Sequence, residues 1–79
     1  MRAIINNMMY STENAHELYF DKPKRELEVG WALWKTNKGN YFLLNTMGEI
    51  HPMEALDAKE WLASRSIEAY CRNWEVEDA

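Results

Sequence analysis

The sequence predicts a small α+β domain, in which a mostly antiparallel sheet of three to four strands is packed by two C-terminal helices and preceded by a short N-terminal helix. Three observations favour this class. Apolar and polar residues alternate in the middle of the chain, apolar residues recur at helical spacing near its end, and turn-forming residues separate the segments. At 79 residues the chain is long enough for one core, so we expect a single domain over residues 1–79 with an acidic tail at 75–79.

The N-terminus predicts a tight turn. Short apolar runs at 3–5 and 8–10 flank Asn6 and Asn7, a residue type that tolerates positive φ. We therefore expect a hairpin or a bent edge strand at this end of the chain.

The residues after Tyr10 favour a helix. Ser11 is a residue type that caps helices, and Glu13 places an anion in the first turn, where the helix dipole favours it. These residues predict a short helix from Thr12 to about Tyr19. Pro23 ends the segment, because proline cannot donate a backbone hydrogen bond and keeps the preceding residue out of the helical region.

The middle of the chain predicts two paired strands. The segment ELEVGWALWKT (26–36) alternates, NKGN (37–40) supplies a turn with a glycine, and YFLLNT (41–46) is the returning strand. A turn at Gly48 leads to a short extended piece, 49–51, before a proline. The apolar face of the first strand consists of Leu27, Val29, Trp31 and Leu33.

The last third of the chain predicts two helices. Pro52 suits the start of a helix over 53–65, and Ser66 suits the cap of a final helix over 67–74. Apolar residues at helical spacing predict the buried side of each helix. The inward residues are expected to be Ala55, Ala58, Trp61 and Leu62 on the first helix, and Ile67, Tyr70, Cys71 and Trp74 on the second.

Composition and charge exclude several classes of protein. The single cysteine, Cys71, rules out an internal disulfide and a cysteine-rich zinc site, and it fits a reducing compartment. The N-terminus lacks the long apolar core of a signal peptide and no segment is apolar enough to span a membrane, so we expect a soluble cytoplasmic protein. Residues 1–48 carry six basic and five acidic side chains, whereas residues 49–79 carry three basic and eight acidic ones.

No catalytic or metal-binding pattern is present. His16 and His51 are the only histidines, and neither has a second ligand at a spacing typical of zinc sites. Cys71 falls on the apolar side of the predicted last helix, where a thiol packs as a small hydrophobe. The three glycines form no phosphate-binding loop. We expect no cofactor, no metal and no enzymatic activity.

Aromatic residues beside lysines leave one alternative open. Trp34, Tyr41 and Phe42 lie around a turn that carries Lys35 and Lys38, and exposed rings near cations stack nucleic-acid bases. The same rings are what a short chain needs for its core. The acidic C-terminal part disfavours nucleic acid, so packing in the core or at an interface is the preferred interpretation. A nucleic-acid-binding accessory module that uses the 34–42 hairpin is the alternative.

The acidic C-terminal part is the remaining functional feature. Solvated helix faces are commonly acidic, but carboxylates on a helix also complement a basic surface of another protein, including a groove that normally holds phosphates. We expect a basic host protein as the partner. The expected contact residues are Glu54, Asp57, Glu60, Glu68, Glu75, Glu77 and Asp78.

A characteristic order of short motifs spans most of the chain: IIN (4–6), YSTENA (10–15), TNKGNYFLL (36–44) and EIHPMEALDAKEWL (49–62). This order resembles a group of short bacterial proteins, often encoded on phages and integrated mobile elements, that read IINGK-Y-DTETA, L-Y-RTKKG-YFL and I-P-x4-A-x-EWL. The chain departs from that group after YFL, where a glycine-rich insert is reduced to LNTMGE (44–49). The matching positions are Ile4, Ile5, Asn6, Tyr10, Thr12, Glu13, Ala15, Leu33, Thr36, Lys38, Gly39, Tyr41, Phe42, Leu43, Ile50, Pro52, Ala58, Glu60, Trp61 and Leu62.

Small acidic proteins of mobile elements include anti-CRISPR inhibitors, which bind a Cas protein and block target recognition. The analogy of size, charge and occurrence on mobile elements leads us to expect an inhibitor whose partner is a Cas subunit and which makes no direct contact with nucleic acid, although the resemblance itself specifies no partner or binding residue. It implies no catalytic residue. Both a monomer and a homodimer are compatible with it.

Overall fold

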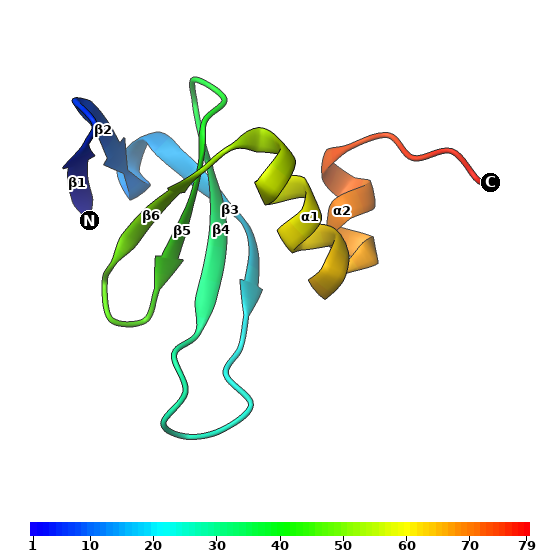
Figure 1. Ribbon diagram of the computed structural model, residues 1–79, viewed down its shortest axis with the longest axis horizontal. Helices are drawn as coiled ribbons and strands as arrows, with labels where there is room; N and C mark the ends of the chain where they lie inside the picture. Colours follow the sequence, from blue (N-terminus) through cyan, green and yellow to red (C-terminus); the bar gives the residue numbers. More distant parts are fainter.

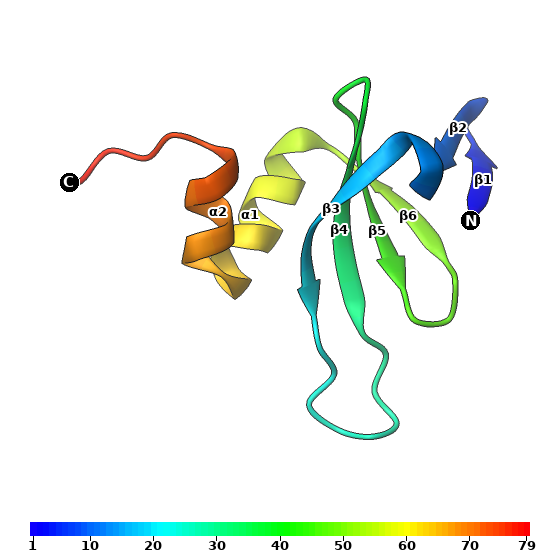
Figure 2. The same cartoon turned by 180° about the vertical axis from the view of Figure 1, so that it is seen from behind.

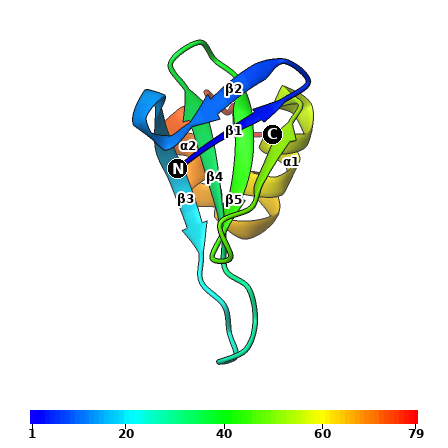
Figure 3. The ribbon, with the colours of Figure 1, turned by 90° about the vertical axis from the view of Figure 1, so that its left-hand side faces the viewer.

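Three layers make up the fold (Figures 1 and 3): an N-terminal hairpin, a four-stranded antiparallel sheet and two C-terminal helices. They are seen in a computed structural model that describes residues 1–79. The α+β class predicted from the sequence is confirmed. The strands are β1 (Arg2–Ile5), β2 (Met8–Ser11), β3 (Ala15–Asp21), β4 (Trp31–Thr36), β5 (Tyr41–Asn45) and β6 (Ile50–Met53), and the helices are α1 (Ala55–Arg65) and α2 (Ile67–Asn73).

The four-stranded sheet has the order β3-β4-β5-β6, and each strand pairs antiparallel with its neighbour. The turns that flank β5 contain Gly39 and Gly48, whose φ angles of 91° and 87° few other residues adopt. Both faces of the sheet are covered. Phe42 packs under the hairpin and Leu33 packs under the helices, each with 0% of its surface exposed. The central strands are therefore apolar on both faces, and their sequence cannot alternate cleanly.

The N-terminal hairpin turns at Asn6 and Asn7, whose φ angles are 52° and 62°. Two consecutive left-handed residues form a type I′ turn, which matches the twist of the flanking strands β1 and β2. The hairpin packs on the sheet through Tyr10, whose ring meets that of Phe42 edge-on with centroids 5.9 Å apart. The hairpin predicted at this end of the chain is confirmed.

The helix predicted over 12–19 is wrong. Only Thr12–Asn14 forms a single 3₁₀ turn, η1, which Ser11 caps by accepting a hydrogen bond from the Glu13 N–H at 3.1 Å. Residues 15–21 form β3 instead and pair along β4. A helix this short is marginal in isolation, so pairing with a neighbouring strand decides the conformation.

The first predicted strand begins later than expected. Residues 26–30 form an irregular loop, and the Leu27 side chain is 99% exposed instead of packing on the sheet. β4 begins at Trp31, which pairs with Asp21 at the end of β3. Pro23 follows the end of β3 and cannot donate a ladder hydrogen bond. Residues 26–30 therefore have no partner strand, although apolar and polar residues alternate in them.

Helix α1 packs on the sheet through Ala58 and Leu62, which are fully buried, and Trp61 lies beside them. Ala55 was predicted to face inward but is exposed. The helix also starts later than predicted, because Pro52 belongs to β6 and still pairs with β5. Ala55 is therefore the first helical residue, and the sheet does not cover it.

Helix α2 is rotated relative to the prediction. Ala69 is its buried residue, and Tyr70 and Trp74 pack against each other with ring centroids 5.0 Å apart. Ile67 and Cys71, both predicted to face inward, are exposed. A small side chain at position 69 lets α2 approach α1 and the sheet closely. The larger rings of Tyr70 and Trp74 then pack beside this contact.

Ser66 separates the two helices and caps the second one. Its Oγ accepts a hydrogen bond from the Ala69 N–H at 3.1 Å, as the sequence predicts. Ser66→Ala is therefore expected to lower the free energy of unfolding by about 1 kcal/mol in chemical denaturation. Ser64→Ala is the matched control, because the exposed Ser64 hydroxyl donates to the Trp61 carbonyl and caps no helix start. Equal losses in the two variants would contradict the capping role.

Candidate functional site

The acidic residues singled out in the sequence lie on the last two helices and the segment after them. Both helices and the C-terminus occupy one end of the molecule, and the N-terminal hairpin occupies the other end (Figures 1 and 2). All seven carboxylate side chains are exposed. We call these residues the acidic C-terminal surface: Glu54, Asp57, Glu60, Glu68, Glu75, Glu77 and Asp78.

On α1, Asp57 and Glu60 lie away from the side that packs on the sheet. Successive helical residues are rotated by about 100°, which places Glu60 nearly opposite the side formed by Ala58 and Leu62. Asp57 lies on the exposed flank, and Glu54 is the N-cap residue, with no capping hydrogen bond from its side chain. The three carboxylates follow one another at three-residue intervals, about 4.5 Å of helix rise per step.

No carboxylate of this surface is neutralised by an ion pair within the chain. The two ion pairs of the structure join Arg25 to Glu28 at 3.9 Å and Arg65 to Asp21 at 3.1 Å. The Arg65 guanidinium also lies over the Trp61 ring, 4.3 Å from its centroid. Arg65 is therefore held by other groups, and the carboxylates of the surface keep their negative charge.

Lys59 is the other cation on α1, and it too has a different partner. Its Nζ lies 5.5 Å from the centroid of the Trp74 ring. A cation over an aromatic face is attracted by the ring quadrupole, which holds the ammonium group on the α2 side of the helix.

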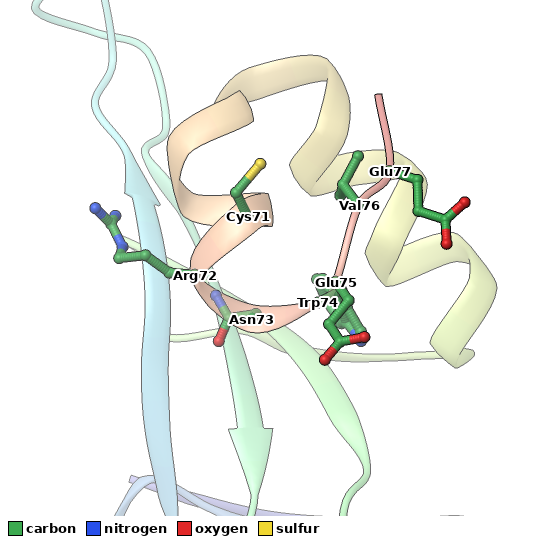
Figure 4. A pocket seen from close by; sticks show the side chains of 7 residues that line it. All are labelled: Cys71, Arg72, Asn73, Trp74, Glu75, Val76 and Glu77. Atoms are coloured by element: carbon green, nitrogen blue, oxygen red, sulfur yellow. The ribbon is translucent and has the colours of Figure 1, made fainter. Parts of the chain in front are cut away.

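A depression of about 470 Å³ lies between α2 and the segment after it (Figure 4). Figure 4 shows Arg72 extending away from Glu75 and Glu77, in agreement with the absence of an ion pair between them. Cys71 is exposed at this depression and no histidine lines it. The depression adds charged edges to the acidic C-terminal surface but assembles no nucleophile with a base.

The histidines lie apart from each other. His16 is exposed on β3, and His51 lies on β6 against Trp31, with ring centroids 5.4 Å apart. No group of three or more His, Cys, Asp or Glu side chains is close enough together to hold a metal ion.

Two rings of the β4–β5 hairpin belong to the core, and a third, that of Trp34, packs against one of them and is half-buried. Tyr41 and Phe42 are buried, and Trp34 stacks on Phe42 with centroids 6.0 Å apart and an angle of 10° between the planes. Lys35 lies over the Tyr41 ring at 5.8 Å. The possibility that Tyr41 or Phe42 is exposed is thus wrong, which weighs against base stacking by this hairpin because a stacking ring must present an open face.

Comparisons of the chain with protein families, with curated proteins and with solved structures give no match. Neither α1 nor α2 is long and apolar enough to cross a bilayer. Function is therefore inferred from the chain's own residues.

Sequence reasoning missed a second site at the opposite end of the molecule. A pocket opens between the N-terminal hairpin and the turn at residues 36–40, and four of the seven asparagines in the chain line it. The available signal was the enrichment of asparagine in the two turns. Because asparagine is also the usual residue of tight turns, that enrichment alone does not indicate a site.

Proposed function

We propose that the chain is a non-enzymatic, cytoplasmic protein-binding domain whose acidic C-terminal surface occupies a basic, nucleic-acid-binding surface of another protein. One observation supports this proposal above the others: seven exposed carboxylates lie on the C-terminal helices and tail without an ion pair in the chain. A surface that keeps its charge attracts a basic partner over long range and raises the association rate.

An exposed apolar side chain accompanies the carboxylates of α1. Leu56 is 67% exposed and lies beside Glu60, since residues four apart are neighbours on a helix. An apolar side chain among charged ones is the usual arrangement of an interface, in which a small dry centre is surrounded by polar contacts. We assign Leu56 as an apolar contact beside Glu60, at the edge of the α1 carboxylates.

A Cas subunit is the partner that we propose. Its groove for guide or target strands carries the positive potential that phosphates meet, and carboxylates on a rigid helix satisfy the same potential. The resemblance of the motifs to short proteins of phages and mobile elements supports this choice. On this proposal the chain is an anti-CRISPR inhibitor that competes with nucleic acid and does not itself bind it.

Charge reversal on α1 tests the proposal. The variant with Glu54→Lys, Asp57→Lys and Glu60→Lys is expected to bind the partner at least tenfold more weakly, a loss of about 1.4 kcal/mol or more. Binding is measured by quantitative pull-down from a CRISPR-bearing host with identification of the captured proteins, followed by titration of the captured Cas protein. The fold is expected to survive, because all three side chains are exposed.

A second triple variant separates the chosen surface from net charge. Glu13→Lys, Glu17→Lys and Glu26→Lys change the total charge by the same amount at exposed positions outside the C-terminal helices. This control is expected to retain most of the affinity. If both triple variants lost the same affinity, or if the α1 variant bound as tightly as the wild type, the acidic C-terminal surface would not be the binding site.

A further inference from the structure

The pocket at the hairpin end, which we call the amide pocket, has a volume of about 520 Å³. One wall is the strand β2, and the other is the turn at residues 36–40. In Figure 3 the hairpin crosses in front of the sheet, and β2 is its strand nearer to this turn. No residue of the acidic C-terminal surface lines the pocket, so binding there does not require the function proposed for that surface.

Four carboxamides line the amide pocket without a hydrogen bond to the protein. They belong to Asn7, Asn14, Asn37 and Asn40. The side chains of other asparagines do bond within the chain; the Asn45 amide, for example, donates to Glu49 at 2.8 Å. Each free carboxamide offers one acceptor and one donor group, which is the pair that a peptide group also carries.

The backbone that carries these side chains is held in place. The Asn37 N–H donates to the Asn14 carbonyl at 2.9 Å, and the Asn40 N–H donates to Thr36 Oγ1 at 3.0 Å. The turn is therefore bonded to η1 and to its own strand, while its carboxamides remain available. A wall positioned in this way loses little conformational freedom when a ligand binds.

The charge of the amide pocket differs from that of the rest of the chain. Its only charged lining residue is Lys38, and no carboxylate lines it, although acidic residues outnumber basic ones by 13 to 9 overall. A basic ligand has no counter-charge there. The amide pocket suits a neutral or acidic ligand that forms several hydrogen bonds.

Strand β2 presents a free backbone edge on the side away from β1. The Thr12 N–H donates to the Met1 carbonyl at 3.1 Å, and Ile5 pairs with Met8 across the two-residue turn. Because bonded and non-bonded pairs alternate in an antiparallel ladder, the N–H and C=O of Met9 point away from β1. No other strand pairs with β2, and Met9 is 52% exposed.

We propose that the amide pocket binds an extended, neutral or acidic peptide segment of another protein. A peptide strand has hydrogen-bonding groups on both edges. One edge pairs with Met9 on β2, as in recognition by strand addition, and the other meets the carboxamides of Asn37 and Asn40. The hairpin of a second copy fits less well than a single peptide strand. It would bring two strands, about 4.8 Å apart, between β2 and the turn at residues 36–40.

Selection from a displayed library of unstructured dodecapeptides tests the proposal on the full chain. Selected peptides are titrated into isotope-labelled protein and followed by amide NMR. They are expected to shift the signals of Met9, Asn37 and Asn40 and not those of α1. Failure to select any binder, or shifts confined to the helices, would overturn the proposal.

A proline at position 9 tests the main-chain pairing. Met9→Pro removes an N–H that makes no bond in the hairpin, a position where edge strands accept proline, and it is expected to weaken the selected peptide at least tenfold. Met9→Ala keeps the N–H and is expected to bind within a few-fold of the wild type. Unchanged binding by a folded Met9→Pro variant would refute strand addition.

The carboxamides provide a test that does not depend on the hairpin. Asn37→Ala with Asn40→Ala removes two side chains that make no bond in the protein, and the double variant is expected to lose at least tenfold in affinity. If Met9→Pro disrupts the hairpin, the peptide affinity of the Asn37→Ala, Asn40→Ala double variant is the test of the proposal. A dimer in light scattering that gives the same NMR shifts without peptide would assign the pocket to a second copy and overturn the proposal.

The α1 triple variant separates this inference from the proposed function. Peptide affinity is expected to stay unchanged when Glu54, Asp57 and Glu60 are replaced by lysine, because α1 contributes nothing to the pocket. Loss of peptide binding in that variant would mean that the peptides recognise the acidic C-terminal surface, which would count against the amide pocket.

Discussion

Replacing Phe42 by alanine is expected to lower the free energy of unfolding by about 3–5 kcal/mol. Phe42 is fully buried in β5, and its ring contacts Tyr10 of the hairpin and Trp34 of β4. A domain of this length has a total stability of about 4–12 kcal/mol, so the variant is expected to lose a quarter of it or more. Chemical denaturation followed by tryptophan fluorescence measures the loss.

Phe20→Ala is the matched control for this prediction. Phe20 lies on β3 and is 39% exposed, so removal of its ring is expected to cost less than about 1.5 kcal/mol. The difference between the two variants measures how much the hairpin layer depends on one buried ring. Similar losses at both positions would mean that the hairpin does not pack on the sheet through Phe42.

Placing a carboxylate at position 58 is expected to unfold the domain. Ala58 is fully buried between α1 and the sheet, where a charged group loses its hydration and finds no cation, at a cost of several kcal/mol. Ala58→Asp is therefore expected to show no cooperative thermal transition near that of the wild type. Circular dichroism and thermal unfolding measure this outcome.

Ala55→Asp, one helical turn earlier, is expected to have the opposite effect. Ala55 is exposed at the first position of α1, where the helix dipole favours an anion by about 0.3–1 kcal/mol. The pair of variants tests whether only Ala58 is covered by the sheet or both alanines are, as the apolar spacing predicts. Equal destabilisation by the two substitutions would mean that Ala55 is buried as well.

The local features of the chain were predictable because they depend on near neighbours. Positive φ at Asn6 and Asn7, the glycine turn at Gly39 and the cap at Ser66 all follow from the chemistry of one residue and its immediate surroundings. The exposure of the acidic C-terminal surface belongs to the same group, since unpaired carboxylates are rarely buried.

The conformation of residues 15–21 and 26–30 was not predictable in this way. The first segment follows a helix cap and becomes a strand because β4 is available to pair with it. The second alternates like a strand and remains a loop, because Pro23 interrupts the strand that would have been its partner. The first outcome depends on hydrogen bonds between two strands, and the second on a partner strand that is missing.

Contacts between residues far apart in the sequence also determine which face of each strand and helix is buried. The sheet is covered by the hairpin on one side and by α1 and α2 on the other. Phe42 is therefore buried and Trp34 is half-buried against it, although their spacing also suits an open binding surface. The amide pocket exists only because the fold brings β2 beside the turn at residues 36–40. Turns, caps and charge are properties of neighbouring residues and can be recognised in the chain, whereas burial and pocket formation depend on partners that only the folded arrangement supplies.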